Sequence, residues 1–239
     1  MRKIGCLALA ALMLLSFVAI MPLSTFAAES PVNLMVVGWY GRGRMTFYSI
    51  PLEDNSMSNP DYKLLPFHWY TTADYWINPT NSYGFSDADV VSNITAAANT
   101  WDSETNFPVF FYNGTTSLVA GTKDGYNVIS WGEYSQSSAI AVTFIWYTRT
   151  RINGRIRTAI VETDTLLNVN FQWSLTGEAG KMDVQNIMMH EFGHWCGLDD
   201  LYNSRDYWLT MYGYANYGET YKQTLGFGDI LGLQAVYGK

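Results

Sequence analysis

Two histidines four residues apart, His190 and His194, most constrain what this chain can fold into. Side chains at this spacing project from one face of an α-helix, so both imidazoles can reach the same point beside it. The helix is expected to begin after Asp183, a good N-cap residue, and to end at Gly197, which suits a helix C-terminus. The chain has only three histidines, so a chance pairing of ordinary helix residues is the less favoured interpretation. The spacing therefore predicts a helix that offers two nitrogen ligands to a metal ion.

The residues around this pair match the needs of a catalytic zinc ion. Two histidines on one helix can hold zinc at about 2.0–2.1 Å. Glu191 follows the first histidine, where its carboxylate can take a proton from water that the metal activates. Asp200 lies three residues beyond Gly197 and is the expected third ligand. Three protein ligands leave the fourth zinc position open for water, which distinguishes catalytic from structural sites.

The run from His190 to Asp200, HEFGHWCGLDD, resembles the long zinc motif of the metzincin metallopeptidases. The run 209–212, LTMY, is similar to the methionine turn of that clan, and residues 228–238 resemble the last helix of matrixins. The resemblance covers roughly residues 67–239. It implies a matrixin-like catalytic domain that holds one catalytic zinc ion and hydrolyses peptide bonds.

The resemblance also implies roles for single residues. Met211 would form the hydrophobic base beneath the zinc ligands, and Asp229 would support the methionine turn through hydrogen bonds. Tyr212 would help to wall the specificity pocket, and Tyr214 would contact the transition state. Core packing is the alternative role for each of these side chains. By the same resemblance, residues 140–148 would form the edge strand along which a peptide substrate lies, antiparallel to it.

The sequence departs from matrixins in ways that change the expected site. Asp200 stands where matrixins have a third histidine. An aspartate at this position is similar to snapalysin, and the run 197–202 also resembles the immune-inhibitor-A group. Asp199 is the less favoured ligand, because it is one residue out of register with that histidine. The mature chain has no cysteine upstream of the motif, so the matrixin cysteine switch cannot operate. Only His68 is left over as a histidine, so no second, structural zinc is expected. Calcium is compatible with the available oxygen donors, but no loop has a diagnostic calcium spacing, and none is assigned.

Hydrophobic periodicity predicts an α/β (α+β, metzincin-like) fold. We expect a mixed, mostly parallel, five-stranded twisted sheet with one antiparallel edge strand, packed by two long helices plus a C-terminal helix. The expected strands of this sheet are residues 73–77, 108–112, 127–131, 140–148 and 155–167, and the expected helices begin near Ser86, Asp183 and Asp229. Asn153-Gly154 predicts a two-residue hairpin between the last two strands. Residues 32–40 are a further candidate strand.

The N-terminus has the pattern of a secretory signal peptide. Arg2 and Lys3 precede an apolar stretch at 4–21, and small residues follow. We therefore divide the chain into a signal peptide at 1–27, a segment of unclear role at 28–66 and a catalytic domain at 67–239. The middle segment is either a propeptide or a source of extra strands. An uncleaved N-terminal anchor is the alternative for the apolar stretch.

Net charge and cysteine content limit the kinds of binding partner and of covalent cross-link that the chain can have. The formal net charge is −7, and loss of Arg2 and Lys3 would make it −9, which argues against nucleic acid or an anionic membrane as the partner. The mature chain keeps one cysteine, Cys196, so no intramolecular disulfide can form, and we expect a monomer. Four arginines flank the hairpin turn at alternate positions, where we expect them to keep an edge hairpin soluble: Arg149, Arg151, Arg155 and Arg157.

Together these patterns predict a secreted, zinc-dependent endopeptidase with Glu191 as general base. A catalytically silent secreted binding protein with a metzincin fold is the alternative. The intact Glu191 argues against it, because binding alone does not need that carboxylate. A metal-dependent hydrolase acting on a non-peptide amide is a third interpretation that the residues leave open.

Overall fold

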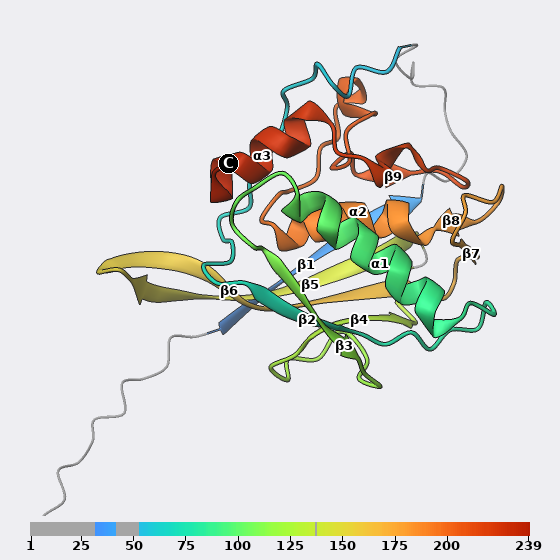
Figure 1. The fold of residues 1–239 in the computed structure, drawn as a ribbon, viewed down its shortest axis with the longest axis horizontal. Helices are drawn as coiled ribbons and strands as arrows, with labels where there is room; N and C mark the ends of the chain where they lie inside the picture. Colours follow the sequence, from blue (N-terminus) through green and yellow to red (C-terminus); the bar gives the residue numbers. More distant parts are fainter. Residues whose placement is uncertain (1–31, 42–52, 137) are drawn as a thin grey trace, which may run out of the picture.

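The computed structural model describes residues 32–41, 53–136 and 138–239 (Figure 1). The predicted signal peptide, residues 1–27, lies outside these ranges. The strands are β1 (Val32–Gly41), β2 (Ala73–Ile77), β3 (Phe110–Thr115), β4 (Asn127–Gly132), β5 (Ala139–Ile152), β6 (Arg155–Asn168), β7 (Trp173–Ser174), β8 (Met182–Asp183) and β9 (Tyr214–Ala215). The α-helices are α1 (Asp87–Asp102), α2 (Val184–Trp195) and α3 (Phe227–Tyr237). Short 3-10 helices lie at Ser204–Asp206 and Tyr221–Gln223.

The strands form a mixed, mostly parallel sheet. Seven of them pair in the order β3-β2-β4-β6-β5-β1-β9, and β7 pairs with β8 separately. Within the large sheet only the β6–β5 and β5–β1 neighbours are antiparallel. The predicted α/β class and the mostly parallel sheet are confirmed. The five strands expected in the sheet are β2 to β6, and β2 has the predicted bounds.

The predicted number of strands and the predicted edge are wrong. The strand expected at the edge is β5, but β1 pairs antiparallel along it, from Val32 opposite Thr148 to Tyr40 opposite Ala139. Beyond β1, the two-residue strand β9 completes the sheet. A strand from the ambiguous segment 28–66 therefore lies about a hundred residues away in sequence from its partner. Local sequence patterns cannot predict a pairing between segments so far apart. Because β1 pairs with the outer side of β5, β5 lies inside the sheet and not at its edge.

The helix ends follow from their capping residues. The Ser86 side chain caps α1 by accepting a hydrogen bond from the Asp89 amide, and Asp183 caps α2 by accepting from Asn186. The buried face of α1 consists of the residues that recur at helical spacing: Val90, Ile94, Ala97, Ala98 and Trp101. Both predicted helix starts are thus confirmed, and α3 begins two residues before the predicted Asp229.

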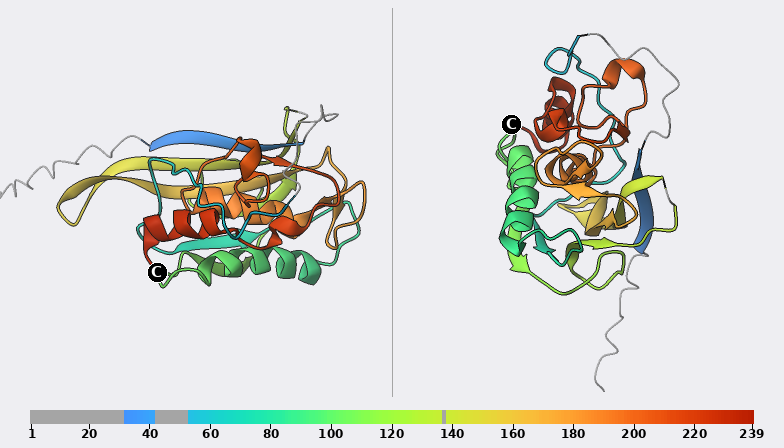
Figure 2. Two further views of the ribbon diagram at one scale, coloured as in Figure 1. Left: turned by 90° about the horizontal axis from the view of Figure 1, so that it is seen from above. Right: turned by 90° about the vertical axis from the view of Figure 1, so that its right-hand side faces the viewer.

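The helices pack on one side of the twisted sheet (Figure 2). Between α1 and α2, the Trp101 indole donates a 2.8 Å hydrogen bond to the Met189 carbonyl. Phe192 and Trp195 of α2 pack against Tyr75 and Phe110 of the sheet. Helix α2 therefore packs against both α1 and the sheet, with nearly all of its residues buried. Within the described ranges, no helix combines the length and apolar character needed to span a membrane.

Candidate metal centre

The side chains of His190, His194 and Asp200 meet beside α2. Their ligand atoms lie within 4.8 Å of one another. Asp200 Oδ1 lies 3.1 Å from His190 Nε2 and 3.8 Å from His194 Nε2. All three residues are buried. The structure thus gathers the three residues predicted as ligands into one group that can hold a metal ion, and no other such group is found in the described part of the chain.

Gly197 is the residue that brings Asp200 back to the helix. Its φ is +91°, in the left-handed region that disfavours residues with a side chain. A Cβ at this position would also lie 2.8 Å from the Phe67 carbonyl oxygen. The Leu198 amide then donates a 2.9 Å hydrogen bond to the Gly193 carbonyl. Helix α2 therefore ends where predicted, and the chain turns toward its own histidines.

Backbone carbonyls determine which nitrogen of each histidine is available. His190 Nδ1 lies 2.8 Å from the Thr210 carbonyl oxygen, and His194 Nδ1 lies 2.9 Å from that of Leu198. A carbonyl oxygen only accepts, so each Nδ1 carries the proton and each Nε2 presents a lone pair toward Asp200. Burial lowers the pKa of His190 to about 4 despite the nearby Asp200 carboxylate. The ring is therefore neutral at pH 7, as a metal ligand must be.

Asp200 is held as a carboxylate. Burial alone would raise the pKa of Asp200, but a hydrogen bond from His190, the charges that His194 and His190 carry when protonated, and the Tyr202 hydroxyl outweigh burial and lower the pKa to about 2. The Tyr202 hydroxyl donates a 2.9 Å hydrogen bond to Oδ2, which leaves Oδ1 toward the histidines. The neighbouring Asp199 turns away: its Oδ2 lies 2.6 Å from Lys63 Nζ. The expected preference for Asp200 over Asp199 is consistent with this geometry.

Glu191 lies fully buried between the ligand helix and the sheet. Its Oε2 accepts a 2.5 Å hydrogen bond from the Thr143 hydroxyl of β5. Its Oε1 is buried and has no hydrogen-bond partner among the described residues. Burial raises the pKa of Glu191 to about 7, against the opposing effects of His194 and Thr143. One oxygen is therefore anchored, while the other is left to receive a proton.

The turn containing Met211 lies beneath the histidines. Gly193 lacks a side chain where Met211 approaches, since a Cβ there would overlap the Met211 sulfur. Asp229 is buried and accepts hydrogen bonds from the amides of Thr210 at 2.8 Å and Met211 at 3.1 Å. The expected hydrogen bonds between Asp229 and this turn are thus present. They position the Thr210 carbonyl that orients His190.

The two tyrosines after Met211 lie farther from the ligands. Tyr212 is buried, with its ring 5.6 Å from that of Tyr207 and 5.7 Å from that of Tyr214. Tyr214 is half-buried on β9, 5.5 Å from the ring of Tyr202. These contacts place both in an aromatic cluster beside Asp200. The roles expected for them, in a specificity pocket and at a transition state, stay predictions.

Sequence reasoning missed Thr143 and Tyr202 as parts of this centre. Thr143 comes from β5, almost fifty residues before Glu191, so only the tertiary fold brings the two together. Tyr202 lies two residues after Asp200, a spacing at which side chains of an extended segment share a face. That spacing is a signal that could have identified Tyr202.

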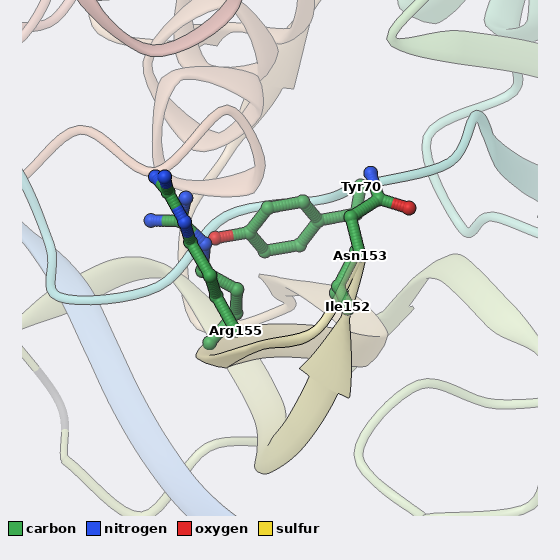
Figure 3. A pocket seen from close by; sticks show the side chains of 5 residues that line it. Tyr70, Ile152, Asn153 and Arg155 are labelled. Carbon is green, nitrogen blue, oxygen red and sulfur yellow. The ribbon is translucent and has the colours of Figure 1, made fainter.

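Two surface pockets flank the sheet and the centre. A pocket of about 460 Å³ opens beside Asp200 and Tyr202 and is lined further by residues 61–63, Leu201, Asn203, Arg205 and Asp206. A second pocket, of about 400 Å³, lies at the exposed β5–β6 hairpin, where Tyr70 lies next to Ile152, Asn153 and Arg155 (Figure 3). Asn153 and Gly154 have φ of 49° and 79°, as the predicted two-residue hairpin requires. The hairpin extends well beyond the helices, so the second pocket is separate from the metal centre (Figure 1).

Comparison of the sequence with models of known protein families found no match, and comparison with curated proteins found none either.

Proposed function

We propose that this chain is a secreted, zinc-dependent endopeptidase of the metzincin type. The observation that carries the proposal is the position of Glu191, whose Oε1 has no partner among the described residues and whose helix also supplies two of three convergent ligands. A buried carboxylate with an unused oxygen is costly to fold around. Its presence beside a ligand group is accounted for by a role in proton transfer.

The donor set favours zinc over calcium. Two imidazole nitrogens and one carboxylate oxygen are typical of a catalytic zinc site with an open fourth position, whereas calcium takes six to eight oxygen ligands. His190, His194 and Asp200 would hold the ion. A bound zinc ion supplies Lewis acidity, which polarises a carbonyl and makes water easier to deprotonate. No further zinc or calcium ion is needed for the proposal.

The chain's own residues supply the proton transfers. Glu191 Oε1 would take a proton from the attacking water and later deliver it to the leaving amine, and its pKa of about 7 suits both directions. Thr143 holds the other oxygen, so the carboxylate cannot rotate away. The carbonyls of Thr210 and Leu198 keep both histidines in the tautomer that binds a metal.

Loss of Glu191 tests this proposal. Zinc-loaded wild type should cleave an unfolded protein substrate, and Glu191→Ala should lower kcat/KM by at least about a thousandfold while retaining one zinc ion per chain. Glu133→Ala, at an exposed glutamate, is the matched control and should cleave like wild type. Cleavage that survives Glu191→Ala would refute the mechanism. Zinc binding without any cleavage, both in the wild type and after strand β1 is displaced from β5, would favour the silent binding protein instead.

A further inference from the structure

Strand β1 lies where an added peptide strand would have to pair. A peptide that extends the sheet beside the metal centre needs the outer edge of β5. In the structure β1 takes that edge over nine residues, from Val32 to Tyr40. Two strands cannot use the same row of amides and carbonyls, so β1 and a peptide at this edge exclude each other.

The register places β1 alongside the reacting groups. Val37 is paired with Thr143, the residue whose hydroxyl binds Glu191. Three residues later, Tyr40 pairs with Tyr214 of β9, whose ring contacts that of Tyr202, the hydrogen-bond donor to Asp200. Residues 37–40 of β1 thus extend from a position beside Thr143, which binds Glu191, to a position beside Tyr214, which lies near Asp200 through Tyr202.

The direction of β1 is also that of the expected substrate. β1 runs antiparallel to β5, and it runs parallel to β9 on its other side. A peptide that pairs antiparallel with β5 would take the position that β1 occupies and would run in the same direction as β1. β1 is uncharged throughout, whereas exposed edge strands usually carry charges that prevent further pairing.

We infer that β1 occupies the peptide-binding edge of the metal centre, so that the chain inhibits itself until β1 leaves β5. This inference rests on the proposed endopeptidase function and adds its regulation. The rest of the sheet does not need β1 to pair, because β2 to β6 are hydrogen-bonded to one another in a continuous order. Departure of β1 would therefore open the site without breaking the fold around the ligands.

Two neighbouring valines allow β1 to be released selectively. Val37 is 6% exposed and packs in the core, whereas Val36 is 42% exposed on the other face of the strand. Val37→Asp would bury a charge without a partner and unseat β1. Val36→Asp places the same charge in solvent and is the matched control. Zinc-loaded Val37→Asp should show at least a tenfold higher kcat/KM than wild type on a peptide substrate, with Val36→Asp within about twofold of wild type.

A second measurement separates this inference from the proposed chemistry. In the Glu191→Ala background, a fluorescent peptide with the sequence of residues 32–41 should bind at least tenfold more tightly to Val37→Asp than to Val36→Asp. Tighter binding without cleavage by any form would support occupation of the edge by β1 and overturn the endopeptidase proposal. Cleavage with equal rates and equal peptide affinities in both variants would overturn the inference and leave the endopeptidase standing. Absence of both binding and cleavage would overturn both.

A reversible lock covers the case in which Val37→Asp fails to fold. Val36 and Phe144 are paired across β1 and β5, so Val36→Cys with Phe144→Cys can join the strands by a disulfide. The only other cysteine among the described residues, Cys196, is buried. The oxidised variant should lose at least 90% of its activity and of its peptide binding, and a phosphine reductant should restore both. Equal activity and binding in the oxidised and reduced forms would contradict the inference.

Discussion

The Tyr202 hydroxyl donates a 2.9 Å hydrogen bond to Asp200 Oδ2, while Asp200 Oδ1 lies 3.1 Å from His190 Nε2. One oxygen of the carboxylate is thus used to orient the other. The Thr210 and Leu198 carbonyls do the same for the histidines. In each proposed ligand, the atom that does not face the centre (Nδ1 of the histidines, Oδ2 of Asp200) makes a hydrogen bond. That bond orients the other atom, Nε2 or Oδ1, toward the centre.

Removal of the Tyr202 hydroxyl should weaken zinc binding. In Tyr202→Phe the Asp200 carboxylate loses the hydrogen bond that fixes its orientation, and loss of such a supporting contact lowers metal affinity by about 10–100-fold. Competition with a chromophoric chelator measures the change. Tyr217→Phe, at a tyrosine that is 55% exposed, should leave zinc affinity as it is. Unchanged affinity in Tyr202→Phe would show that Asp200 needs no such support.

Gly193 and Met211 should be energetically coupled. A Cβ at Gly193 would overlap the Met211 sulfur and lie 3.0 Å from the Trp101 ring. Gly193→Ala should therefore lower the free energy of unfolding by about 1–3 kcal/mol, although alanine in an exposed helix would stabilise by up to about 1 kcal/mol. Urea unfolding of the chelated protein measures this.

A double-mutant cycle supplies the control for that collision. Met211→Ala removes the sulfur, so adding Gly193→Ala to it should cost at least about 1 kcal/mol less than in the wild type. Additive costs would mean that Met211 does not press against the ligand helix. The proposed base beneath the zinc ligands would then need another side chain.

Asp164 should make stability fall as pH rises through the mildly acidic range. Burial raises the pKa of Asp164 to about 7, with the charges of Glu162 and Asp124 adding to the effect and the amides of Gly121 and Val128 opposing it. The folded pKa is above the ordinary value of 3.8, so folding favours the protonated carboxyl. Its stabilising effect is complete below about pH 4 and is lost as pH rises through about 7.

The comparison with Asp164→Asn isolates this carboxyl from other titrating groups. The free energy of unfolding of the wild type minus that of Asp164→Asn should fall between pH 4 and 7, by up to about 1.4 kcal/mol per pH unit. Urea unfolding at several pH values measures both proteins. A difference that stays level or rises over this range would show that the two backbone amides keep Asp164 charged.

Residues that act locally could be recognised in the sequence. Ser86 and Asp183 cap the helices as predicted, Gly197 reverses the chain, and the His190–His194 spacing puts both rings on one side of α2. In each case the structural reason lies within a few residues. The apolar spacing in α1 likewise defines its buried face without reference to the rest of the chain.

What the sequence could not predict depends on contacts between distant segments. The pairing of β1 with β5 joins strands about a hundred residues apart. Backbone hydrogen bonds do not depend on which side chains the two strands carry, so the side-chain pattern of neither strand predicts its partner. Thr143 has no feature that relates it to Glu191 before the sheet and α2 are packed together. The prediction that β5 forms the edge of the sheet was wrong for this reason. A strand lies at an edge only if no other strand pairs with its outer side, and β1 pairs with that side of β5.

X-ray absorption at the zinc edge, on the purified zinc-loaded chain, tests the central claim most directly. We predict one zinc ion with two imidazole nitrogens and carboxylate oxygen at about 2.0–2.2 Å, and no sulfur. A zinc–sulfur distance of about 2.3 Å, or a spectrum without imidazole scattering, would contradict a centre built from His190, His194 and Asp200.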